Sequence, residues 1–142
     1  MLGARQLLLD EPLDVPLEDR HRQRADAEHG IVETKLSGIV SPEMVRQETE
    51  QAIALAHAND CLFFLSDYSE AETGFSIVDV FELPALQAEA DLDQCAQIAL
   101  IAPVSSAGRE LAEFYETVCF NRGWSARVLS DRESALAWLV GP

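Results

Sequence analysis

The chain has 142 residues, of which 48% are hydrophobic and 25% charged, as in a single globular domain large enough to bury a core. Its 25 acidic and 10 basic residues give a net charge of −15, which argues against nucleic acid and anionic membranes as partners. Because no stretch approaches the roughly 20 apolar residues of a membrane span and no signal-peptide pattern is visible, we expect a cytoplasmic protein.

The N-terminal 19 residues predict an arm or leader, since they carry two prolines and scattered leucines without a sustained period. A single α/β domain is expected over residues 20–142. It begins with a predicted hairpin, in which the segments Arg20–Ala27 and Ile31–Leu36 flank a turn at Gly30.

A helix is predicted from Ser41 to about Asn59. Ser41 is a suitable N-cap, Pro42 fits the first helical position, and Glu43 favours the positive end of the helix dipole. An apolar stripe runs along this helix through Val45, Ala52, Ile53 and Ala56. The apolar run Cys61–Ser66 then predicts a strand covered on both faces.

The segment Phe75–Ala90 predicts a kinked or two-part helix, because Pro84 interrupts its apolar pattern. Ser76 is its expected cap, with Asp79 in the first turn. A surplus of exposed apolar side chains around residues 75–86 would mark a groove or an interface. Ile98–Ala102 is the next predicted strand.

The C-terminal third has the clearest periodicity. An amphipathic helix is predicted through residues 111–119, with Gly123 at its C-terminal cap, and a short strand over Ser125–Leu129. Ser130 and Glu133 form an expected capping box that opens the last helix.

Strands and helices therefore alternate in the order β-β-α-β-α-β-α-β-α, which predicts a single-domain mixed, mainly parallel sheet with helices packed on its faces. Ligands of such sheets tend to sit beyond the carboxyl ends of the strands. That rule brings Asp67–Ser76, Val104–Arg109 and Ser130–Arg132 to one edge.

The runs GIVETKLSGIVSPE and FYETVCFNRGWSARVLSDRESALAWL, with the strand that leads to Asp67, resemble the SpoIIAA-like group, which is related to the STAS domains and to lipid-binding Sec14-type folds. The resemblance covers roughly residues 29–140. It implies a non-enzymatic α/β module that acts in regulatory partner switching or holds an apolar ligand. In STAS antagonists a partner kinase phosphorylates a serine at a helix start after a buried strand. The usual aspartate-serine pair is not recognisable here, so Ser69 and Ser76 are positional candidates.

Asp67, Ser69 and Ser76 are thus the candidate residues of a switch loop. A phosphate on either serine would add roughly two negative charges among neighbouring carboxylates and would open the loop or block a docked partner. The alternative is that Ser76 only caps a helix and that the other polar residues solvate a surface loop.

A second candidate is an anion site formed by Ser105, Ser106, Gly108 and Arg109 at a predicted helix start. Free amides, the helix dipole and a guanidinium would suit a carboxylate, a phosphate or a lipid head group. The alternative is a capped helix with Arg109 paired to a surface carboxylate.

Catalysis has little support, because no nucleophile elbow, metal-ligand cluster or Cys-His arrangement is readable; no catalytic residue, metal or cofactor is expected. An acid-base pair of Asp67 and Tyr68 is a remote alternative. The three cysteines are expected to be reduced and buried.

Two functions remain open. One is a regulatory module that binds a protein partner, or a second copy of itself, through residues 67–86. The other is a binding module for an apolar or amphiphilic small molecule, with its tail between that segment and the sheet and its acidic end near Arg109.

Overall fold

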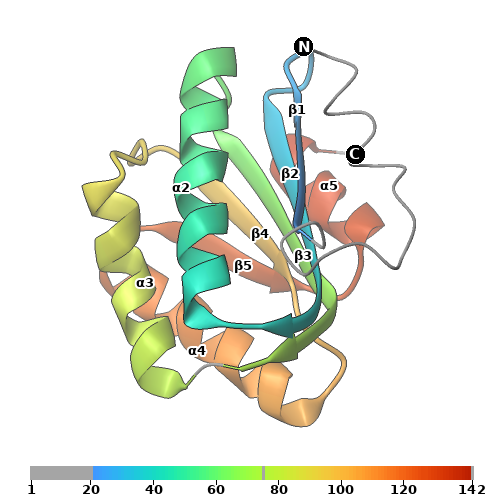
Figure 1. Ribbon diagram of the computed structural model, residues 1–142. Helices are drawn as coiled ribbons and strands as arrows, with labels where there is room; N and C mark the ends of the chain where they lie inside the picture. The colour runs from blue at the N-terminus through green and yellow to red at the C-terminus, as the bar shows by residue number, and fades with distance from the viewer. Residues whose placement is uncertain (1–20, 75, 142) are drawn as a thin grey trace.

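The computed structural model describes residues 21–74 and 76–141. The predicted arm over residues 1–19 lies outside these residues. The elements follow in the order β1 (His21–Asp26), β2 (Ile31–Val40), α2 (Pro42–Asn59), β3 (Phe63–Thr73), α3 (Ile77–Glu89), β4 (Gln97–Ile101), α4 (Ser106–Asn121), β5 (Ser125–Leu129) and α5 (Arg132–Val140) (Figure 1).

The five strands form one sheet in the order β1-β2-β3-β4-β5. β1 and β2 make an antiparallel hairpin, and its turn contains Gly30 at φ 72°. The other neighbouring pairs are parallel, because a helix connects each strand to the next. The predicted α/β class with a mainly parallel sheet is therefore confirmed.

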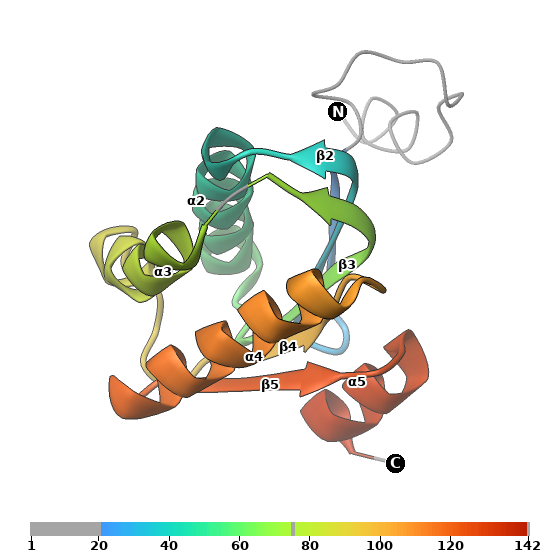
Figure 2. The same cartoon turned by 90° about the horizontal axis from the view of Figure 1, so that it is seen from below.

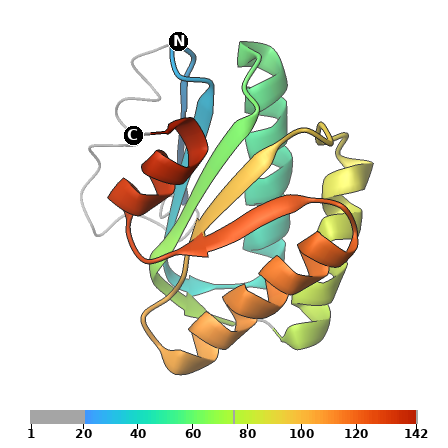
Figure 3. The same ribbon diagram turned by 180° about the vertical axis from the view of Figure 1, so that it is seen from behind.

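Helices cover both faces of the sheet. α2, α3 and α4 lie on one face and α5 on the other (Figures 2 and 3). The larger core, between the sheet and the three helices, includes Val32, Ile53, Phe64, Val80, Ile98 and Tyr115. The smaller core under α5 includes Ile31, Leu65, Ile101 and Leu139. Residues on both faces of β3 are thus buried, which explains its apolar start.

β3 is longer than the sequence predicts, and this corrects the switch-loop prediction for residues 67–73. The strand runs to Thr73 because β2 continues to Val40 and pairs with it beyond an irregularity between Lys35 and Ser37. Asp67 lies opposite Ile101, where β4 ends. Only residues 74–76 connect β3 to α3, so Asp67 and Ser69 belong to a strand and Ser76 to a helix cap.

Two helix predictions change in detail. α3 is one helix of 13 residues that contains the buried Pro84, so the two-part alternative is wrong. α5 is capped by Asp131, whose side chain accepts a hydrogen bond from the Ser134 amide at 2.7 Å, and not by Ser130. Among the cysteines, Cys61 and Cys119 are buried and free, whereas Cys95 is free but exposed.

Candidate functional site

A cavity of about 90 Å³ lies between the sheet and the three helices on its larger-core side. Strands β3 and β4 form its floor, and α2, α3 and α4 form its walls. Most of its lining is apolar, contributed by Val45, Ala52, Ile53, Phe64, Val80, Leu83, Leu92, Ile98, Leu100, Pro103, Leu111 and Ala112. The apolar lining gives an occupant a hydrophobic environment.

A carboxyl group is buried in this lining. Glu48 points inward from α2, and the Tyr68 hydroxyl on β3 donates a hydrogen bond to its Oε1 at 3.0 Å. Burial raises the pKa of Glu48 to about 7, although the bond from Tyr68 acts in the opposite direction. Burial likewise raises the pKa of Tyr68, so this hydroxyl remains protonated and able to donate.

A second polar pair lies beside the first. The Tyr115 hydroxyl on α4 donates to Oε1 of Gln87 on α3. Burial is the main cause that raises the pKa of Tyr115, and the neighbouring Cys119, Glu48 and Tyr68 add to it. The side chains of both pairs line the same cavity. Gln87 is only 4% exposed, and its Nε2 has no hydrogen-bond partner.

The Cys119 thiol also interacts with the Gln87 and Tyr115 side chains. Burial raises the pKa of Cys119 to about 11, so a thiol is present at neutral pH. Tyr115 and Gln87 would stabilise its thiolate. A neutral thiol is a weak acceptor, however, so it leaves the Gln87 Nε2 without a strong partner.

The sequence reasoning missed Glu48, Gln87 and Tyr115 as site residues, and it named Tyr68 only as a partner of Asp67. Glu48 lies within the apolar stripe of α2, three residues after Val45 and four before Ala52, where a carboxylate has to be buried. Gln87 occupies the same kind of position on α3, seven residues after Val80. A polar residue that interrupts an apolar helical stripe is the signal that could have found both.

The three candidate switch residues do not come together. Asp67 Oδ1 accepts hydrogen bonds from the Ser69 amide at 2.9 Å and the Ser69 hydroxyl at 2.6 Å. Ser76 is exposed, and it caps α3 in a capping box with Asp79. The predicted cap is therefore confirmed, while a switching role for any of these residues stays a prediction.

An exposed apolar patch follows directly after Ser76. Ile77, Val78 and Phe81 on α3 are 56%, 62% and 49% exposed, and we call them the α3 patch. The Arg122 guanidinium lies 4.7 Å from the centre of the Phe81 ring. Exposed apolar side chains are thus present on α3, where a surplus of them was expected to mark a groove or an interface.

The candidate anion residues lie at the start of α4. Ser105 caps the helix and accepts a hydrogen bond from the Gly108 amide at 3.0 Å, and the Arg109 amide donates to the Ser105 carbonyl at 2.9 Å. Gly108 is buried, lines the cavity and has no room for a side chain, because a Cβ there would lie 2.6 Å from Pro103 Cβ. Ser106 is exposed.

The Arg109 side chain is not part of the cavity wall. It is exposed and pairs with Glu113 at 3.6 Å. The anion site therefore stays a prediction, without a connection to the cavity through this guanidinium.

Asp67 and Tyr68 do not form an acid-base pair, because neighbouring residues of a strand point to opposite faces of the sheet. Tyr68 bonds to Glu48 on the α2 side. On the α5 side, the pKa of Arg132 is raised chiefly by its hydrogen bond to Glu33, and the charge of Asp67 adds to this. Within residues 21–74 and 76–141, no group of three or more His, Cys, Asp and Glu side chains could hold a metal ion. No helix in this part of the chain is long and apolar enough to cross a membrane.

Comparison with known proteins gives similarity in structure but not in sequence. No protein-family model matches the chain, and no curated protein sequence matches it. The solved structure of the anti-sigma factor antagonist SpoIIAA in its unphosphorylated form is similar over 82% of this chain and 93% of that chain, with 12% identity and a TM-score of 0.49. Likeness at this level leaves function to be argued from the residues themselves.

Proposed function

We propose that this protein is a regulatory interaction module that docks a partner protein on the α3 patch. The observation that carries the proposal is the exposure of three large apolar side chains, Ile77, Val78 and Phe81, within two turns of one helix. Apolar side chains gathered in this way, with a polar surround, are typical of protein interaction sites.

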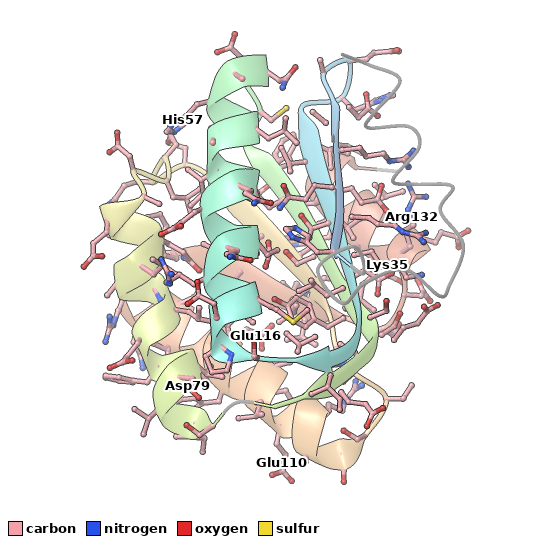
Figure 4. The ribbon with its side chains drawn as sticks, viewed as in Figure 1. Lys35, His57, Asp79, Glu110, Glu116 and Arg132 are labelled. Carbon is pink, nitrogen blue, oxygen red and sulfur yellow. The ribbon has the colours of Figure 1, made fainter. Side chains whose placement is uncertain are left out.

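The acidic residues around the patch favour one kind of partner, although Arg122 contributes a cation over the Phe81 ring. Asp79 and Glu82 lie on the same helix, and Figure 4 shows Asp79 and Glu110 near the starts of α3 and α4, at the same end of the molecule. With a net charge of −15, two copies of this chain repel each other. The partner is therefore a different protein, with an apolar patch surrounded by basic residues.

Ser76 is the proposed control point of this docking. It directly precedes Ile77, and its hydroxyl lies 3.1 Å from an Asp79 carboxylate oxygen. A phosphate at this position would repel Asp79, would disturb the capping box and would have to be desolvated when the patch is covered. Phosphorylation is thus expected to release the partner.

The test is capture from an extract of the host, followed by a binding titration with the purified captured protein. Val78→Ser is expected to weaken binding at least tenfold, because it removes apolar area from the patch. Val140→Ser is the matched control, since Val140 is also an exposed helical valine but lies on α5. Equal weakening by both variants, or self-association of the wild type in sedimentation, would contradict the proposal.

Two substitutions of Ser76 separate charge from capping. Asp and Asn are both good N-caps, so Ser76→Asn should preserve binding, whereas Ser76→Asp should weaken it through its added charge. If the two variants bind the partner equally, Ser76 serves only as a cap.

A further inference from the structure

We propose that the cavity is a binding site for a small neutral molecule with an apolar body and one oxygen that accepts a hydrogen bond from Gln87 Nε2. The cavity faces the sheet, whereas the α3 patch is exposed on the surface of the same helix, so this site is separate from the proposed docking surface.

The unpaired amide of Gln87 is the first observation. Gln87 is 96% buried, lines the cavity and leaves Nε2 without a partner. A buried donor in this state destabilises the folded protein, because it has lost its hydrogen bonds to water without gaining a partner. An apolar side chain at this position would avoid that cost, and a ligand oxygen would remove it.

The composition of the wall gives the charge of the ligand. Among the residues that the structure describes, no Lys, Arg or His lines the cavity, while Glu48 adds a carboxyl group. An anion would meet this carboxyl group without a compensating cation, and its desolvation would be costly. A hydroxyl suits the site best, because it can accept from Gln87 and donate to an acceptor such as Glu48.

The volume gives the size of the ligand. A cavity of about 150 Å³ holds benzene, so one of about 90 Å³ takes fewer atoms, on the order of three to five apart from hydrogen. Short-chain alcohols have this size, this charge and this single oxygen. For so few atoms, the expected dissociation constant is in the millimolar range.

The probe is 1-propanol, added to the full-length ¹⁵N-labelled protein while the Gln87 side-chain amide signals are followed by NMR. Propionate and propylammonium are the matched anion and cation. We expect 1-propanol to shift the Gln87 signals in a saturable manner and propionate to leave them unchanged. Shifts with propylammonium at lower concentration than with 1-propanol would overturn the neutral-ligand proposal.

Variants at position 87 complete the test. Gln87→Leu should weaken 1-propanol binding about tenfold, the factor expected for one lost hydrogen bond. Gln87→Met serves the same purpose if the leucine variant fails to fold. Gln47→Leu, at an exposed glutamine of α2, should leave binding unchanged. If no probe shifts the wild-type signals saturably, the cavity holds only water and the proposal is wrong.

Discussion

Glu48 makes the stability of the protein depend on pH in an unusual direction. Its pKa is raised from 4.5 to about 7 in the folded protein, chiefly by burial, so the folded state binds its proton more tightly than the unfolded chain. The free energy of unfolding should therefore fall as the pH rises from about 4.5 to about 7. The contribution lost is roughly 3 kcal/mol, from about 1.4 kcal/mol per pKa unit.

Glu48→Gln isolates this contribution, because glutamine keeps the acceptor for Tyr68 but does not titrate. Denaturant unfolding at pH 5 and pH 8 should show that the variant loses less stability than the wild type over this interval. The half-buried His21, whose pKa is lowered by desolvation, acts in the opposite direction but is present in both proteins and cancels in the difference. An identical pH dependence of the two proteins would mean that Glu48 is hydrated and ionised throughout.

Substitutions at the start of α5 test whether Asp131, and not the predicted Ser130, caps this helix. Because the Asp131 carboxylate accepts the hydrogen bond from the Ser134 amide, Asp131→Ala should cost about 1 kcal/mol, seen as a melting temperature lower by about 2–4 °C. Ser130→Ala should change stability by less than about 0.5 kcal/mol. Asp131→Asn keeps the cap and serves as the control. The reverse ranking of the two alanine variants would restore Ser130 as the cap.

Elements that carry their own local signals were predictable from the sequence. Ser41 with Pro42 marks the start of α2, and β5 lies where Ser125–Leu129 was expected. The end of β3 was not predictable, because its polar residues 67–73 are strand only through pairing with the extension of β2. Local propensity contains no information about such a pairing between distant segments.

The residues of the candidate site show the same difference between local signals, which the sequence reveals, and contacts between distant segments, which it does not. Ser76 was found because capping is a local property, confirmed by its bond to the Asp79 amide. The polar end of the cavity was missed because Glu48, Tyr68 and Gln87 come from three different elements. Only the tertiary fold brings these side chains together.

At the scale of the whole molecule, an excess of negative charge opposes folding. A net charge of −15 on 142 residues produces repulsion that is greatest in the compact state. One cluster counteracts it locally: Glu33 on β2 pairs with Arg24 on β1 and with Arg132 on α5, and the hydrogen bond from Arg132 is the main cause of its lowered pKa. The other ion pairs of the described residues are largely exposed and contribute little.

Salt should therefore stabilise this protein. The Debye length shortens from roughly 20 Å to roughly 6 Å between 20 mM and 300 mM NaCl, so repulsion between distant carboxylates is screened more than the close contacts of Glu33. We expect the melting temperature to rise by a few degrees over this range, with KCl equivalent to NaCl. A fall in the melting temperature would mean that the ion pairs outweigh the repulsion.

Docking of a basic partner should respond to salt in the opposite direction, because the same screening weakens the attraction of the partner to the acidic surface. If salt raises the melting temperature and weakens partner binding, the negative charge of the protein is the common cause of both effects.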